Sequence, residues 1–196
     1  MLSRLSPYWL WAVLAIPALT MISPFFATDT HALRGVLHGS GEFSARFLII
    51  SLMATPLMIA TRGSSVARWL KNNRRYIGVA AFFYAAIHTA AYVMGADLAR
   101  ILADATRFDL LMGWLAFVVF IPLAATSMDY AVRRMGLWWK WLQRWTYAAA
   151  VLTLLHWAAL HDWHGWIAPA IHFTPLIALT IYRIWWSNFR PRLAKV

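Results

Sequence analysis

Six apolar segments divide the 196-residue chain at intervals typical of membrane helices. At 1.5 Å per residue, segments of this length cross a hydrocarbon core about 30 Å thick. The sequence between them is short and carries most of the charge, which leaves almost no room for a soluble domain. The pattern predicts a single all-α integral membrane domain over residues 1–196. We expect a six-helix transmembrane bundle with spans at about residues 7–27, 44–61, 76–95, 109–127, 143–160 and 166–186.

The composition agrees with a membrane protein. Hydrophobic residues make up 62% of the chain and charged residues 13%, and the mean hydropathy is +0.58. Such a chain has too few polar residues to cover a soluble globule. It also has no cysteine, which excludes disulfide frameworks, thiolate metal sites, iron–sulfur clusters and cysteine nucleophiles.

The net charge of +11 follows the topology. If the N-terminus lies inside, most basic residues fall on the cytoplasmic side and six of the seven acidic residues fall outside, as the positive-inside rule requires. This predicts cytoplasmic N- and C-termini, and it explains the basic charge without nucleic acid. The 14 basic residues on the inner side, of 18 in total, are Arg4, Arg62, Arg68, Lys71, Arg74, Arg75, Arg133, Arg134, Lys140, Arg144, Arg183, Arg190, Arg192 and Lys195.

Two segments have features of their own. The first apolar run follows Arg4 and ends near Ala27, so a cleaved signal peptide is an alternative to a retained helix. The bulky residues Phe25 and Phe26 favour the helix. The stretch 129–145 mixes basic residues with four tryptophans and predicts a segment lying on the inner membrane surface.

All seven histidines fall in the outer half of this topology, and His88 and His156 lie inside the third and fifth spans. A polar side chain within a span is a candidate functional residue. His88 follows Arg75 by 13 residues, and His156 follows Gln143 by 13 residues. Both helices run outward, so each histidine lies about 20 Å from the inner boundary. The two side chains can therefore face each other at one depth.

Small residues flank both histidines. The helical face around His88 carries Tyr84 and Tyr92 among alanines, and the face around His156 carries Ala149, Thr153 and Ala159. Close helix packing would also use small residues, and a histidine hydrogen-bonded to a neighbouring helix is the alternative for either one. Zinc would need further close ligands. Two histidines at equal depth with space beside them suit a b-type haem held edge-on between the third and fifth helices, with His88 and His156 on the haem iron.

The remaining polar candidates have plainer alternatives. His38 and His172 are candidates for a quinol pocket, since imidazole titrates near neutral pH; His38 also fits a loop residue, and His172 an interhelical hydrogen bond. The run HDWH at 161–164 has a metal-binding spacing, but its place in a short loop between spans favours an ordinary solvated loop. Arg74 and Arg75 suit a haem propionate or a flavin phosphate, or act only as topology determinants.

Three stretches resemble a known family: HGSGEFSARFLIISLMATPL (38–57), RRYIGVAAFFYAAIHTAAYV (74–93) and ATSMDYAVRRMGLWWKWLQRWTYAAAVLTLLHW (125–157). The family is that of the haem-binding membrane subunits of bacterial periplasmic methionine sulfoxide reductase systems (MsrQ, or YedZ), within the ferric-reductase-like transmembrane superfamily. The resemblance covers about residues 38–190. Its most specific pieces are TPL at 55–57, RRxxG at 74–78, Thr-Ser at 126–127 and the histidines of the third and fifth helices.

The resemblance implies a six-helix protein of the bacterial inner membrane that binds haem b, with FMN as a further candidate cofactor. Such a protein takes electrons from quinol or from a cytoplasmic flavin reductase. It passes them to a periplasmic molybdopterin subunit that reduces methionine sulfoxide in proteins. His88 and His156 match the histidines of the family.

One position departs from the family pattern. Where the family usually has a Leu-His pair at the start of the fifth helix, this chain has Leu142 and Gln143. The wider superfamily can hold two stacked haems, and the inner ligand positions are here Arg75 and Gln143. We therefore expect one haem, near the outer face.

Two other functions fit parts of the pattern. A direct ferric or cupric reductase would use the same haem without a partner. A small metal transporter would collect cations on the outward histidines, although no acidic residue lies deep in a span to carry a cation through.

Overall fold

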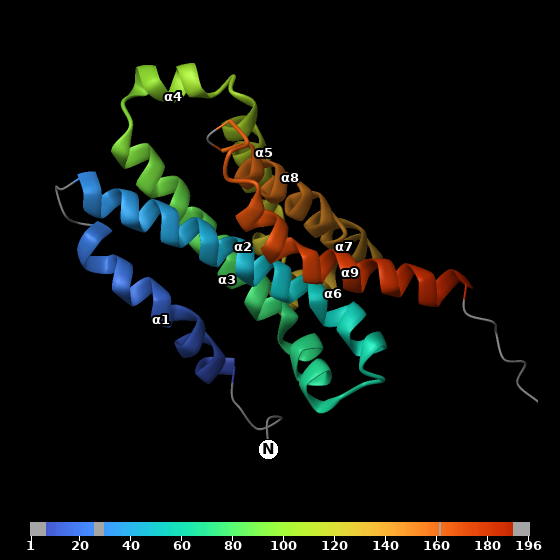
Figure 1. Ribbon diagram of the computed structural model, residues 1–196. Helices are drawn as coiled ribbons and strands as arrows, with labels where there is room; N and C mark the ends of the chain where they lie inside the picture. Colours follow the sequence, from blue (N-terminus) through green and yellow to red (C-terminus); the bar gives the residue numbers. More distant parts are fainter. Residues whose placement is uncertain (1–6, 26–29, 161, 190–196) are drawn as a thin grey trace, which may run out of the picture.

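The computed structural model describes residues 7–25, 30–160 and 162–189 (Figure 1). Every regular element within these ranges is a helix. Four of the helices are long and apolar enough to cross a membrane, and Tyr8–Ile22 forms a shorter apolar helix. The chain is thus an all-α membrane protein, and the six crossings stay a prediction.

The helices, in chain order, are α1 Pro7–Phe25, α2 Thr30–Ala60, α3 Ser65–Gly95, α4 Leu98–Asp104, α5 Phe108–Ala125, α6 Asp129–Met135, α7 Leu137–Gln143, α8 Trp145–Ala159 and α9 Ile167–Phe189. Each predicted span overlaps most of its length with one of the helices α1, α2, α3, α5, α8 and α9. Several sequence expectations fall outside the described residues, namely those on Arg4, Phe26, Ala27, His161, Arg190, Arg192 and Lys195.

Helices α2 and α3 form the longest antiparallel pair, and both begin well before the predicted spans at 44 and 76. The outer part of α2 is rich in polar residues and glycine, so hydropathy does not reveal it. It is helical because Glu42 pairs with His38 and with Arg46 one turn away on either side, and because Val36 and Ser40 are buried. His38 therefore lies on a helix and not in a loop.

The second pair consists of α5 and α8, which pack against each other over most of their length. The segment predicted to lie on the inner surface joins them as the short helices α6 and α7, which meet at Gly136 with φ of 54°. The indole Nε1 of Trp139 donates to the carbonyl of Thr126 at 2.9 Å and ties α7 to the end of α5. That this segment rests on the membrane surface stays a prediction.

Helices α1 and α9 lie at the periphery, and α4 closes one end of the bundle (Figure 1). Helix α1 packs on α2 and α3, and α9 packs on α2 and α8. Helix α4 was not predicted; Asp97 starts it by accepting the backbone N–H of Arg100 at 2.7 Å. The connection between α2 and α3 lies at the opposite end of the bundle, so the two ends can be followed as an outer and an inner one.

The central core joins both helix pairs. Its buried members come from α2, α3, α5, α8 and α9: Leu48, Ile49, Leu52, Ala81, Phe120, Ala149, Ala150, Phe173 and Leu176. Because the two pairs share this core, the residues above it are held at fixed positions relative to one another.

Candidate functional site

A cavity of about 450 Å³ lies between the two helix pairs on the outer side of the core. It is lined by side chains from α2, α3, α5 and α8, and His88 and His156 both face it. Small residues such as Ala85, Thr89 and Thr153 form part of its wall. The volume is that of a typical small-molecule or cofactor site.

The structure brings the two histidines together. Their ring centroids lie 6.1 Å apart and the ring planes are 82° apart. Nδ1 of His88 lies 2.8 Å from the carbonyl oxygen of Leu37, and Nδ1 of His156 lies 2.7 Å from that of Asp109. A carbonyl only accepts, so each Nδ1 carries the proton and donates it. In the neutral form of each ring, this leaves the lone pair of Nε2 for a ligand such as a metal.

Two glycines leave the space in which the histidine rings reach these carbonyl oxygens. A Cβ at Gly41 would lie 2.8 Å from Nδ1 of His88, and a Cβ at Gly113 would lie 2.8 Å from Nδ1 of His156. Real side chains do not approach this closely. Each ring thus occupies the space that a side chain at the facing helix position would fill.

A haem fits the cavity on these observations. Two iron–nitrogen bonds of about 2 Å, together with the distance from each nitrogen to its ring centre, add up to roughly the observed 6.1 Å separation. The lining is otherwise mainly apolar, with aromatic side chains at Trp114, Phe117 and Phe120. Among the described residues, no three His, Cys, Asp or Glu side chains gather as a site for a bare metal ion.

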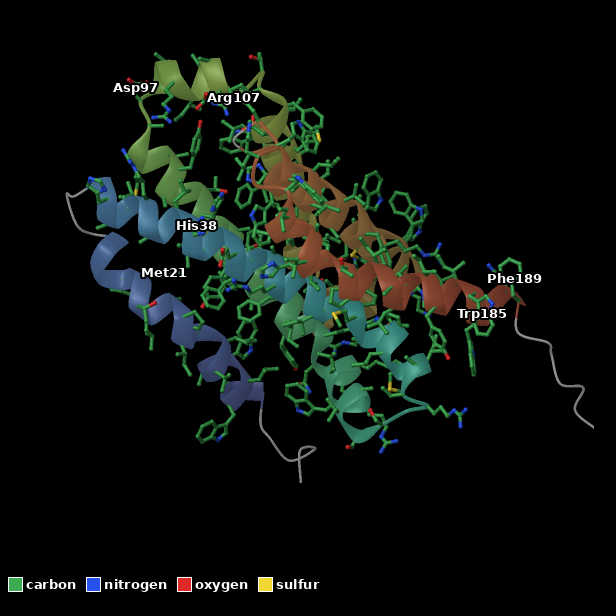
Figure 2. The ribbon with its side chains drawn as sticks, viewed as in Figure 1. Met21, His38, Asp97, Arg107, Trp185 and Phe189 are labelled. Atoms are coloured by element: carbon green, nitrogen blue, oxygen red, sulfur yellow. The ribbon has the colours of Figure 1, made fainter. Side chains whose placement is uncertain are left out.

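The outer mouth of the cavity carries an ion-pair cluster at the α4 end of the bundle. Arg107, at this end in Figure 2, contacts Asp109 at 2.8 Å and Asp104 at 3.3 Å, and both carboxylates are buried. The hydroxyl of Tyr92 donates to Asp104 at 3.0 Å. The hydrogen bond to Asp109 and the charge of that carboxylate raise the pKa of Arg107 above its ordinary value. The cluster fastens the α4 connection over the cavity.

The other predicted site residues either line the cavity, lie away from it, or lie at the inner end of the bundle. Tyr92 and His38 line the cavity. Tyr84 does not: its hydroxyl donates to the carbonyl of Leu14 in α1 at 2.9 Å, and its ring packs on aromatic rings of α2. His172 lies against the ring of Trp157 at 5.0 Å, and its Nδ1 donates to the carbonyl of Ala168 at 2.8 Å.

Arg75 and Gln143 lie at the inner end, around a second cavity of about 130 Å³. Arg75 pairs with Asp129, and Nε2 of Gln143 donates to the carbonyl of Leu123 at 3.2 Å. Phe120 lines both cavities. The inner positions thus face a much smaller space than the histidines do, and their polar atoms already have protein partners.

Sequence reasoning missed the two glycines and the role of Arg107. A glycine inside an apolar helix weakens the helix and commonly marks close packing or function, so Gly113 carried a usable signal. Gly41 stands among other glycines of α2 and was not distinguishable from them. The pairing of Arg107 with Asp109 is a local contact two residues apart that spacing alone does not reveal.

Fold and site define an all-α membrane protein that holds a cofactor-sized cavity and two facing histidines between two helix pairs. The family model described as "Ferric reductase like transmembrane component" matches residues 40–154, more than half of the chain. The chain belongs to this family, and within it to the MsrQ family of heme-binding subunits.

Three curated relatives illustrate the likeness, and each is named protein-methionine-sulfoxide reductase heme-binding subunit MsrQ. The protein from Polaromonas naphthalenivorans is 34% identical over 81% of this chain and 74% of its own length. That from Ralstonia nicotianae is 33% identical over 90% and 83%, and that from Herminiimonas arsenicoxydans is 34% identical over 78% and 71%. No solved structure gives a significant match.

Proposed function

We propose that this chain is the haem-binding, electron-transferring membrane subunit of a protein-methionine-sulfoxide reductase. The observation that carries the proposal is the pair of imidazoles 6.1 Å apart on one cavity of about 450 Å³. The names of the relatives, all haem-binding subunits of that reductase, agree with it. The partner is a periplasmic molybdopterin subunit, and the setting is the bacterial inner membrane with both termini in the cytoplasm.

His88 and His156 are the residues proposed to hold the iron of one haem b, which would supply single-electron transfer. With two protein ligands, such a group would favour electron transfer over oxygen chemistry. The carbonyls of Leu37 and Asp109 hold each imidazole in the tautomer whose Nε2 can bind iron. Tyr92 and His38, on the cavity wall, are the proposed outer contacts of the cofactor.

Electrons come, on this proposal, from quinol in the lipid bilayer or from a cytoplasmic flavin reductase, with FMN as a second candidate cofactor. Reduction of a sulfoxide to a thioether takes two electrons and two protons and releases water, so a one-electron carrier would have to deliver two electrons per turnover. Arg75 lines the inner cavity, and Phe120 lines both this cavity and the proposed haem cavity. This proximity supports entry of electrons from the inner side.

An absorbance spectrum of the detergent-purified protein tests the proposal. We expect a Soret band with sharp reduced α and β bands, and one haem per chain. The bands should be lost in His88→Ala and His156→Ala and kept in His172→Ala, a matched control because His172 does not line the cavity. A wild-type protein without these bands, after expression with ample haem, contradicts the proposal.

A direct ferric or cupric reductase is the second candidate, because the matched family model is described as a ferric-reductase-like transmembrane component. Such an enzyme reduces chelated metal on its own. Co-purification with a periplasmic molybdoenzyme, together with slow reduction of chelated iron by the isolated protein, decides for the electron-transfer subunit. Fast reduction of chelated iron without a partner decides for the metal reductase.

A further inference from the structure

The two helix pairs repeat one construction around the two histidines. In the first pair, His88 of α3 lies on Gly41 of α2 and donates to the carbonyl of Leu37. In the second pair, His156 of α8 lies on Gly113 of α5 and donates to the carbonyl of Asp109. In both cases the accepting carbonyl belongs to the residue four positions before the glycine.

The spacing of four has a physical reason. In an α-helix, the carbonyl four residues back already accepts the N–H of the glycine, and its second lone pair points outward past the position of the glycine. A side chain there would cover that lone pair. In both helices the missing Cβ leaves room for an imidazole N–H to reach it.

We propose that Gly41 and Gly113 are positioning residues for the two axial imidazoles. Each glycine opens a helix carbonyl to Nδ1–H, and together they fix both rings in the iron-binding tautomer with crossed planes. This inference rests on the proposed haem function and adds to it two residues, outside the ligand set, that set the electronic properties of the site.

Two spectroscopic properties follow from this arrangement. Donation from Nδ1–H to a carbonyl makes an imidazole a stronger electron donor, which favours ferric iron and lowers the midpoint potential. Ring planes 82° apart give oxidised bis-imidazole haem a strongly anisotropic low-spin EPR signal, whereas parallel planes give a rhombic one. Neither property depends on activity or on the partner subunit.

The experiment compares four alanine variants of the full chain in detergent. Gly41→Ala and Gly113→Ala place a Cβ 2.8 Å from Nδ1 of a histidine, so that ring must turn and lose its hydrogen bond. Gly35→Ala, in the same helix as Gly41, meets nothing within 4 Å, and Gly78→Ala meets only ordinary contacts at 3.9 Å and beyond. The last two are controls for the change of glycine to alanine in a helix.

We expect the first two variants to bind haem about 10–100-fold more weakly. Their remaining haem should have a raised midpoint potential and a less anisotropic EPR signal, while the controls match the wild type. Gly41→Ala and Gly113→Ala proteins with wild-type potential and EPR signal overturn the inference. A wild-type protein without haem overturns the proposed function itself, and the inference with it.

A double variant covers the case in which Gly41→Ala does not fold. All three atoms that the new Cβ would meet belong to His88, so His88→Ala in the same chain removes the obstruction. Gly41→Ala/His88→Ala should elute as a monodisperse peak, without haem. An aggregated double variant shows that Gly41 serves helix packing and not the ring, and overturns the inference.

Discussion

The outer and inner cavities lie in one bundle and share Phe120, yet they differ in almost every other respect. The outer one has a volume of about 450 Å³ and the inner one about 130 Å³. At the outer one, two histidines face each other; at the corresponding inner positions stand Arg75 and Gln143. The difference teaches that a ligand position becomes a cofactor site only when space and orienting partners accompany it.

The polar partners point the same way. The histidines bond through Nδ1 and keep Nε2 for the cavity. Arg75 and Gln143 direct their donors to Asp129 and to the carbonyl of Leu123, which bind the inner ends of the helices to one another. The outer residues are thus arranged around a cavity, and the inner ones bond to other parts of the protein.

Truncating the residue that lines both cavities is the strongest way to break this comparison. Phe120 is 4% exposed, and Phe120→Ala enlarges both spaces and removes a large core side chain. We expect a loss of about 3–5 kcal/mol of stability, as for other buried phenylalanines, measured by thermal unfolding in detergent. Val118→Ala, on the same helix and 58% exposed, is the control and should change little. Equal stability of the two variants would show that the core around Phe120 does not hold the two helix pairs together.

Opening the outer mouth should have a smaller effect. Arg107→Gln leaves the buried carboxylate of Asp109 without its guanidinium partner, and leaves that of Asp104 with Arg100 at 3.6 Å and the hydroxyl of Tyr92. We expect a loss on the order of 1–3 kcal/mol and faster proteolysis of the α4 connection. Arg133→Gln, at an exposed position of α6, is the control. Unchanged proteolysis would mean that Arg107 does not hold the connection in place.

Removing a hydrogen bond between α2 and α3 tests how much a single polar contact at the outer cavity contributes to stability. The hydroxyl of Ser44, on the wall of the outer cavity, donates to the carbonyl of Ala81 in α3 at 2.9 Å. Ser44→Ala removes this bond between α2 and α3, and we expect a loss of about 0.6 kcal/mol, the average for interhelical hydrogen bonds in membranes. Ser187→Ala is the control, because among the described residues its hydroxyl bonds only to Ile184 and Asn188 of the same helix. A loss several times larger would identify Ser44 as part of the site.

Restoring the missing family histidine should have the smallest effect on haem content. Gln143→His supplies one imidazole, but Arg75 still stands at the opposite position and the cavity measures about 130 Å³. We expect haem to stay at one per chain by pyridine haemochrome assay against protein concentration. A second haem in this variant would show that ligand identity alone, and not space, distinguishes the two ends.

The fold and part of the site were predictable because they depend on regular spacing. Helix rise is constant, so 13 residues from Arg75 and from Gln143 placed His88 and His156 at one depth, and the structure has the rings 6.1 Å apart. The early start of α2 was not predictable from hydropathy, since polar pairs such as His38 and Glu42 hold that part as a helix.

The rest depends on packing between helices, which a single sequence does not display. Tyr84 shares a helical face with His88 by count, but α1 offers its hydroxyl a carbonyl and its ring turns away from the cavity. Gly41 differs from Gly35 only in what lies opposite it. Neighbouring helices decide both cases, so the residues that orient the histidines became visible only in three dimensions.

The length of α2 and α3 has a consequence for the distance that an electron travels. Each has 31 residues, or about 46 Å at 1.5 Å per residue, against a hydrocarbon core of about 30 Å. The excess must tilt within the bilayer or project beyond it. The outer turns of α2 around His38 are polar, which favours projection of this end of the helix beyond the hydrocarbon core, next to the mouth of the cavity. With the proposed topology, a soluble partner can approach the histidines from the periplasm without entering the lipid.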